Sequence, residues 1–190
     1  MIFAGVVLLG LSAMAGLYVA VLYNRLVSLK HDTAKAWSNI DVLLKQRHDE
    51  LPKLVETCRQ FMAHERQTLE QIMLARAGVY AARKSGDMAV LGAAEGRLRR
   101  GLSNLFAVAG ACPQLQASGA FRNLEARISG LENAIADRRE YYNEVVNANN
   151  VRLEQFPDVI VARLFAFESA DLLEFDAAET ADVDIRALFG

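Results

Sequence analysis

The first 24 residues, MIFAGVVLLGLSAMAGLYVAVLYN, contain no charged side chain, and Arg25 is the first charge after them. A helix rises about 1.5 Å per residue, so about twenty apolar residues cross the hydrocarbon core of a bilayer. A cleaved signal peptide is the competing interpretation, because Ala13-Met14-Ala15 resembles a cleavage site. However, no basic residue precedes the apolar run, and the run continues well past that site. The sequence therefore favours an uncleaved membrane anchor over residues 1–24.

Basic residues follow this apolar run, whereas only the α-amino group precedes it. Arg25, Lys30 and Lys35 come directly after the run. Because Lys and Arg are enriched on the cytoplasmic side of membrane spans, we expect the N-terminus outside and the remaining chain in the cytoplasm. The sequence contains no second long apolar run, so we predict a single-pass protein of the bacterial inner membrane, in contact with the lipid bilayer.

Three small residues, Ser12, Gly16 and Ala20, lie four positions apart on one face of the predicted span. Small residues at this spacing let two transmembrane helices approach closely. Glycine and alanine are also common in membrane helices that make no such contact. The spacing predicts self-association through the span, with this ordinary composition as the alternative.

The rest of the chain has helical apolar spacing and no strand-like alternation. We expect helices over residues 24–50, 53–84, 88–111 and 118–155. A turn at residues 84–87 and Pro113 separate the later helices, and Pro52 separates the first two. The apolar spacing continues across Pro52, so one long kinked helix is the alternative there. Four helices with short connections predict an antiparallel up-and-down bundle.

Two charges interrupt the apolar stripe of the first of these helices. Arg47 falls on the packed face and Asp41 lies beside it, while Arg138 interrupts a similar stripe on the fourth helix. In an antiparallel helix pair, one register places Asp41 opposite Arg138 and Arg47 opposite Glu132. The sequence therefore favours two structural charge pairs over a solvated edge or a ligand site.

The segment FPDVIVARLFAF, residues 156–167, is too short to span a bilayer and too apolar to leave in water. The same register places Phe156 beside Tyr23, where the apolar run ends. We expect a membrane-interface segment, covered by lipid head groups or by a neighbouring subunit. Packing on the end of its own bundle is the alternative. The residues that define this segment are Phe156, Ile160, Arg163, Leu164 and Phe165.

From Glu168 onward, acidic residues outnumber basic ones strongly. An acidic tail with few aromatic residues is usually solvated rather than packed. Docking of the tail on a basic face such as Arg97 to Arg100 is the alternative. That basic face is itself interpreted as a solvated helix surface, with anionic lipid or an acidic partner as a second possibility.

Familiar catalytic and metal-binding motifs are missing from the sequence. His64-Glu65 begins like a zinc-protease helix, but Thr68 stands where the second histidine is needed. Cys58 and Cys112 lack metal-type spacing, so we expect both reduced in the core, with a disulfide between them as the alternative. The formal net charge of −2 argues against nucleic acid as a partner. We therefore expect no enzymatic activity, cofactor or metal.

Four segments resemble the LemA family, in order and at similar spacing, over most of residues 22–175. They are YNRLVSLKHDTAKAWSNIDVLLKQRHDELPKLVE, FMAHERQTLEQIMLAR, ENAIADRREYYNEVVNANN and FPDVIVARLFAFE. The resemblance implies a membrane anchor, a cytoplasmic helical bundle and no established enzymatic activity. Some members of the family take part in organising magnetosome membranes, which suggests a scaffolding role by analogy.

These patterns together predict an all-α protein with three parts. Residues 1–24 are the transmembrane anchor, residues 25–156 a long antiparallel up-and-down four-helix bundle in the cytoplasm, and residues 157–190 an apolar membrane-proximal segment with an acidic tail. The predicted function is a non-catalytic scaffold that forms a homo-oligomer and organises membranes or membrane complexes. The alternative is an adaptor that binds and modulates a membrane protein such as an enzyme or a protease.

Overall fold

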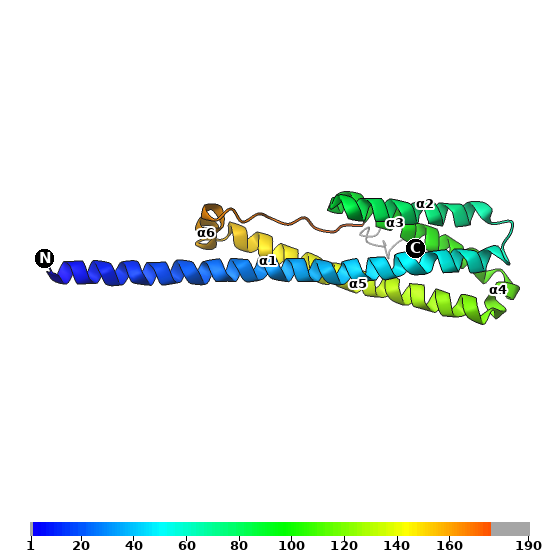
Figure 1. Ribbon diagram of the computed structural model, residues 1–190, viewed down its shortest axis with the longest axis horizontal. Helices are drawn as coiled ribbons and strands as arrows, with labels where there is room; N and C mark the ends of the chain where they lie inside the picture. Colours follow the sequence, from blue (N-terminus) through cyan, green and yellow to red (C-terminus); the bar gives the residue numbers. More distant parts are fainter. Residues whose placement is uncertain (1, 176–190) are drawn as a thin grey trace, which may run out of the picture. The chain divides into compact units, whose positions relative to one another are not determined.

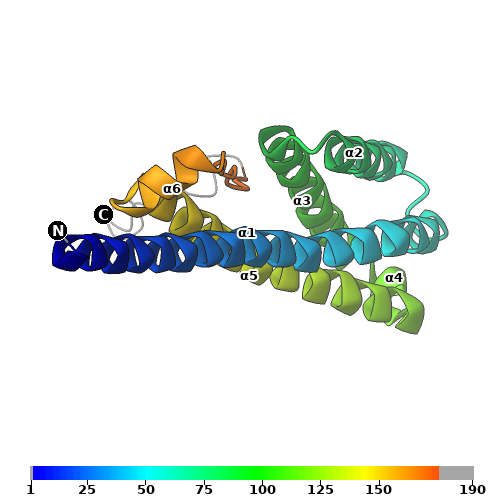
Figure 2. The same cartoon turned by 60° about the vertical axis from the view of Figure 1, so that its left-hand side comes forward.

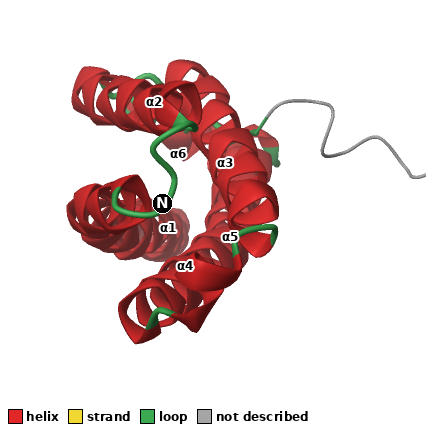
Figure 3. Ribbon diagram, turned by 90° about the vertical axis from the view of Figure 1, so that its right-hand side faces the viewer, coloured by secondary structure: helices red, strands yellow, loops and turns green. Residues whose placement is uncertain are grey.

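The computed structural model describes residues 2–175 and contains only α-helices as regular elements in that part of the chain (Figure 1). The predicted all-α class is confirmed. Figure 3 shows the helices joined by loops, with no strand between residues 2 and 175. The helices are α1 (Ile2–Arg59), α2 (Arg66–Ser85), α3 (Met88–Gly110), α4 (Pro113–Ala117), α5 (Gly119–Glu154) and α6 (Asp158–Leu164).

The described residues form two compact units, and both include parts of α1 and α5. Unit 1 comprises residues 2–40 and 138–172, and unit 2 comprises residues 41–137 and 173–175. In unit 1, the rings of Trp37 on α1 and Tyr142 on α5 pack with their centroids 5.9 Å apart. In unit 2, α2 and α3 pack against each other as consecutive helices (Figure 2).

Pro52 lies inside α1, and the helix continues past it to Arg59. The predicted break at Pro52, with a second helix starting at residue 53, is therefore wrong, and the alternative of one long helix across Pro52 holds. A proline inside a helix leaves the carbonyl four positions earlier without its usual N–H donor. That carbonyl belongs to His48, and it accepts a hydrogen bond from Nε of Arg76 on α2 at 2.9 Å. Leu51 and Leu54, which flank the proline, are fully buried. The packing of α2 thus replaces the hydrogen bond that the proline removes.

The predicted turn at residues 84–87 is confirmed. Gly86 closes α2 with φ of 73°, a left-handed conformation that suits a residue without a side chain. The Asp87 side chain then caps α3 by accepting a hydrogen bond from the Val90 backbone N–H at 3.0 Å. The two helices can therefore reverse direction within two residues, which brings their apolar faces together.

After α6, residues 168–175 form an extended segment, which we call the strap. Asn150 on α5 holds one end, because its Oδ1 accepts from the Ala170 N–H at 2.9 Å and its Nδ2 donates to the Ala170 carbonyl at 2.8 Å. Further along, the side chains of Leu173 and Phe175 are buried. The prediction of a solvated tail is therefore wrong for Leu173 and Phe175, whereas the acidic residues Glu168, Asp171 and Glu174 are exposed as expected. The remainder of that tail lies outside the described residues.

Candidate functional site

The N-terminal part of α1 has the composition of a membrane span. It is the one helix among residues 2–175 that is long and apolar enough to cross a bilayer, with a mean hydropathy of 2.2 over its most apolar window. Every described side chain from Phe3 to Val21 is exposed. A helix that exposes apolar side chains all round requires an apolar environment. By length and composition, the predicted span over residues 1–24 corresponds to this part of α1.

The first buried residues of α1, Leu22 and Leu26, lie directly after the exposed stretch. They pack against Val161 and Ala162 of α6, with Leu153 and Phe167 at the edge of the cluster. The Tyr23 ring meets the rings of Phe165 and Phe167 edge-on, with centroid distances of 4.8 Å and 5.7 Å. The segment after α5 thus returns to α1 at the end of the apolar stretch.

Phe156 is not the partner of Tyr23 that the sequence predicted. The ring partners of Tyr23 are Phe165 and Phe167, and Phe156 is 81% exposed. The predicted register requires α5 to continue straight to residue 156, but α5 ends at Glu154 and α6 begins at Asp158. The return of the chain through α6 brings the later aromatic residues to Tyr23 instead.

Helix α6 has one buried face and one exposed face. Asp158, Val161 and Ala162 are buried, and Nε of Arg152 lies 3.4 Å from an Asp158 carboxylate oxygen. The exposed face carries Ile160 and Leu164, which are 58% and 72% exposed. The predicted interface residues that lie on or beside this exposed face are Phe156, Ile160, Arg163, Leu164 and Phe165.

The three small residues of the predicted association face are all exposed on α1. The Ser12 hydroxyl donates to the Leu9 carbonyl at 3.0 Å, within its own helix. Gly16 and Ala20 contribute to a shallow hollow of about 280 Å³ beside Phe165. The remaining residues that line this hollow are Val19, Tyr23 and Asn24. Self-association through this face stays a prediction.

Arg47 forms the centre of a buried charge network in unit 2. Its side chain is 1% exposed, and its Nη2 donates to both carboxylate oxygens of Glu95 on α3, at 2.6 Å and 2.7 Å. Its Nη1 donates to Glu132 on α5 at 2.7 Å. The predicted pair of Arg47 and Glu132 is confirmed. The same guanidinium therefore links α1 to two other helices.

Glu95 is the main buried residue that the sequence reasoning missed. It falls on the apolar stripe of α3, four residues after Leu91 and three before Leu98, and both leucines are buried. A carboxylate at that position is as conspicuous as Arg47 is on α1. The predicted register relates only the first and fourth predicted helices and therefore omits Glu95, which lies on the third.

One arginine meets two carboxylates in this network. Burial lowers the pKa of Arg47, but Glu95 and Glu132 outweigh this effect and raise that pKa above its ordinary value. Burial raises the pKa of Glu95, and Arg47 opposes that increase. Glu132 is 15% exposed, so water reaches the second carboxylate more readily than the first. Arg47 is thus the residue that makes a buried carboxylate at position 95 tolerable.

The predicted pair of Asp41 and Arg138 is wrong. The Asp41 carboxylate accepts hydrogen bonds from Nε and Nη2 of Arg83 on α2, the latter at 2.8 Å. Arg138 is exposed. The physical reason is that α2 packs beside this part of α1, where the His48 and Tyr80 rings also stack at 5.1 Å. Helix α2 therefore supplies the forked guanidinium that a carboxylate prefers.

The reassigned pair gives a prediction for two matched arginine variants. Arg83→Ala is expected to lower the free energy of unfolding by about 0.5–1 kcal/mol, because the pair with Asp41 is only partly buried. Arg138→Ala is expected to change it by less than about 0.5 kcal/mol, as for most surface substitutions. Chemical denaturation followed by circular dichroism measures both. A larger loss for Arg138→Ala than for Arg83→Ala would contradict the reassignment.

The LemA family model matches residues 36–186. This chain belongs to the LemA family. Two relatives are the magnetosome proteins MamQ 1 and MamQ 2 of Paramagnetospirillum magneticum. Each is 24% identical over 191 residues, which cover 88% of this chain and 70% of the relative. The resemblance seen in the sequence is confirmed, and these relatives together with the apolar α1 fit a membrane-associated protein.

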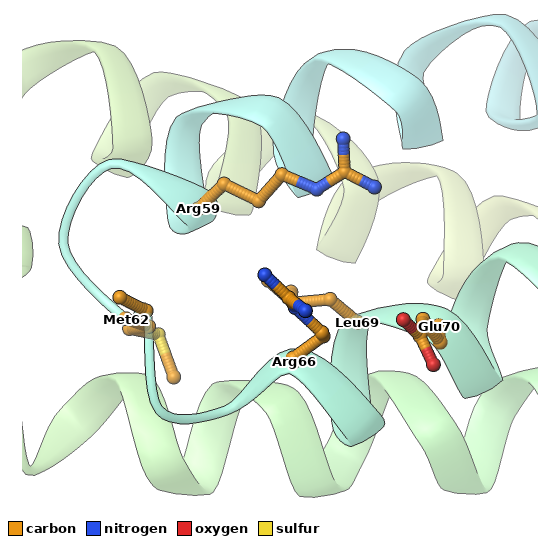
Figure 4. A pocket seen from close by; sticks show the side chains of 6 residues that line it. Arg59, Met62, Arg66, Leu69 and Glu70 are labelled. Carbon is orange, nitrogen blue, oxygen red and sulfur yellow. The ribbon is translucent and has the colours of Figure 1, made fainter.

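A second feature of this LemA-family chain is a basic hollow where α1 and α2 connect. Figure 4 shows the Arg59 and Arg66 side chains reaching over the gap between the end of α1 and the start of α2, with Glu70 on the next turn. The hollow has a volume of about 410 Å³, and Met62, Ala63 and Leu69 complete its lining. Both arginines are exposed, so the hollow is open to water.

Cys58 and Cys112 of this LemA-family chain are not bonded to each other, and the predicted core location holds for Cys58 but not for Cys112, which is half-buried between α3 and α4. Cys58 is fully buried on α1, and burial raises its pKa to about 11. A thiol with so high a pKa carries little thiolate at neutral pH and reacts slowly. Among residues 2–175, no group of three or more His, Cys, Asp or Glu residues is placed to hold a metal ion.

Proposed function

We propose that this LemA-family protein is a membrane-anchored, non-catalytic scaffold. One observation carries the proposal: α1 is a continuous helix that is exposed and apolar up to Val21 and buries one face from Leu22 onward. A single element therefore serves both as the anchor and as part of the packed helices. The scaffold bundle consists of α1, α2, α3 and α5 in an antiparallel up-and-down arrangement.

The proposed location is the bacterial inner membrane, with the N-terminus outside and the packed helices in the cytoplasm. Support comes from Arg25, Lys30 and Lys35, which are all exposed and follow the apolar stretch. Basic residues flanking a span favour the cytoplasmic side. The two relatives are magnetosome proteins, which supports a membrane location. We extend that location to this chain as part of the proposal.

Self-association through α1 is the second part of the proposal. Ser12, Gly16 and Ala20 leave one face of the span open to close approach by another helix. A scaffold of this kind organises a membrane, or complexes within it, by placing several anchored copies side by side. Each copy then presents its packed helices to neighbouring molecules.

The alternative function is an adaptor that binds and modulates a membrane enzyme or protease. The observation that favours it is the basic hollow of Figure 4, where Arg59 and Arg66 offer two exposed guanidinium groups. Such a surface suits an acidic segment of a partner protein. An adaptor has no need to assemble with its own copies. The oligomeric state of the purified protein therefore distinguishes the two functions.

The test is the molar mass of the full chain in a mild detergent, measured by light scattering. We expect the unchanged protein to be oligomeric. Replacing Ser12, Gly16 and Ala20 together with leucine is expected to shift it towards the monomer, because the larger side chains separate the helices. A matched control replaces Val7, Met14 and Val21, which lie on the opposite face of the helix, with leucine.

The control variant is expected to keep the oligomeric mass. A monomeric unchanged protein would contradict the self-associating scaffold and favour the adaptor. An oligomer that survives all three leucines at Ser12, Gly16 and Ala20 would assign assembly to the packed helices rather than to the span.

A further inference from the structure

The exposed face of α6 has no protein partner within unit 1. Ile160 and Leu164 point away from the buried cluster that Val161 and Ala162 form with α1. Phe156 before the helix is 81% exposed, and Phe165 after it is half-exposed, with its ring against Tyr23 of α1. Large apolar side chains grouped on one surface mark a contact with something apolar. The alternative of packing on its own bundle accounts for the inner face of α6 but leaves the outer face uncovered.

The position of α6 along α1 is fixed by its inner face. Val161 and Ala162 pack on Leu22 and Leu26, which directly follow the exposed apolar stretch of α1. When that stretch lies in the hydrocarbon core, α6 lies at the boundary between acyl chains and head groups. Tyr23 is at the same level, and tyrosine is enriched at this boundary.

The charge on the exposed face suits the same boundary. Arg163 is exposed on this face, between Ile160 and Leu164. An arginine side chain can lay its apolar stem along lipid and reach the phosphate layer with its guanidinium. Short amphipathic segments of this kind lie in the plane of the interface, with apolar residues directed into it.

A second copy of the chain is a poorer candidate for the same surface. A stable protein interface buries about 800 Å² on each partner. Helix α6 has seven residues, and its inner face is already occupied by α1. The outer face is too small to supply such an area alone, whereas each apolar side chain that enters lipid contributes separately.

We propose that the exposed face of α6 is a second membrane contact, in which Ile160, Leu164 and the flanking Phe156 and Phe165 insert into the lipid interface of the leaflet where α1 leaves the bilayer. The inference rests on the proposed membrane anchoring of α1. It gives the chain two contacts with one leaflet instead of one. The partner of this surface is therefore lipid rather than protein.

The experiment measures tryptophan quenching by lipids with brominated acyl chains, using the full chain reconstituted in phosphatidylcholine vesicles. Trp37 is the single tryptophan of the chain and lies fourteen positions beyond Tyr23 on α1, roughly 20 Å further along the helix. The test chain carries Trp37→Phe with Ile160→Trp. The positive control carries Trp37→Phe with Leu17→Trp, inside the apolar stretch. The unchanged chain, with Trp37 alone, is the negative control.

We expect strong quenching of the tryptophan at position 17, clear quenching with blue-shifted emission at position 160, and no quenching of Trp37. A second chain with Trp37→Phe and Leu164→Trp, on the same face of α6, is expected to match position 160. These results together would support insertion of α6.

Quenching at position 17 without quenching at positions 160 and 164 would overturn the inference while leaving the anchor in place. That outcome includes a second copy covering the face, because a protein partner shields it from bromine. Absence of quenching at position 17 would contradict the proposed anchoring and the inference with it.

Discussion

Replacing Arg47 with methionine is expected to lower the free energy of unfolding by about 3–5 kcal/mol, because it leaves the buried Glu95 carboxylate without its counter-charge. Glu95 is 2% exposed, and both of its oxygens accept hydrogen bonds from Arg47. No other cation is hydrogen-bonded to Glu95 within the described residues. A buried charge that loses its partner costs more than the pair contributes, so the loss exceeds the ordinary value of a salt bridge.

The double variant Arg47→Met with Glu95→Leu distinguishes this cause from general damage to the core. Removing both charges leaves apolar side chains of similar length, and we expect recovery of much of the lost stability. Glu132 is partly exposed and can turn to water. Lys45→Met, an exposed position on the same helix, is the matched control and is expected to have little effect.

The measurement is denaturant unfolding of the full chain in mild detergent, followed by circular dichroism. A loss for the double variant as large as that for Arg47→Met alone would mean that the network does not depend on the pairing of these two charges. Stability of Arg47→Met equal to that of Lys45→Met would mean that Arg47 is not buried against Glu95.

The helices were predictable where the sequence contains strong local signals. Helices α3 and α5 lie within two residues of their predicted ends, because Gly86 and Asp87 mark one boundary and Pro113 marks another. Pro52 left two interpretations open, a break or one continuous helix, because its effect depends on whether another residue supplies the hydrogen bond that proline removes. Arg76 supplies a hydrogen bond to the His48 carbonyl, and nothing near Pro52 in the sequence shows this.

The charge network was only half predictable for a similar reason. The pair of Arg47 and Glu132 follows from the spacing of two antiparallel helices, which the sequence carries. The pair of Asp41 and Arg83 depends on the way α2 packs beside α1. Periodicity identifies which face of a helix is buried, but it does not identify which neighbour covers that face.

The buried part of the strap could not be predicted from composition. The tail as a whole is acidic, and an average over the tail hides two apolar residues within it. Two apolar side chains, Leu173 and Phe175, are buried among these acidic neighbours. Glu174, between them, places its carbonyl against Gly92 of α3. This contact requires a residue without a Cβ atom at position 92. In the sequence, Gly92 is one of 12 glycines. Only the arrangement of the chain distinguishes it from the others.

Gly92→Ala is expected to displace the strap and to lower the free energy of unfolding by about 2–5 kcal/mol. A Cβ atom at position 92 would lie 1.8 Å from the Glu174 carbonyl oxygen and 2.9 Å from its carbon. These are backbone atoms, so no side-chain rotation relieves the contact. Leaving Leu173 and Phe175 in water costs about 1.5–3 kcal/mol each, and the better helix propensity of alanine returns about 1 kcal/mol.

Gly101→Ala is the matched control, because Gly101 lies on the same helix and a Cβ there meets only Ile72 Cγ1, at an ordinary 3.5 Å. That variant is expected to be stabilised by up to about 1 kcal/mol. Limited proteolysis is expected to cleave the strap near Glu174 in Gly92→Ala but not in Gly101→Ala. Adding Leu173→Ala to Gly92→Ala should cost little more, since both changes act through the same segment. Equal stability and equal protection of the two glycine variants would show that the strap does not lie against Gly92 in solution.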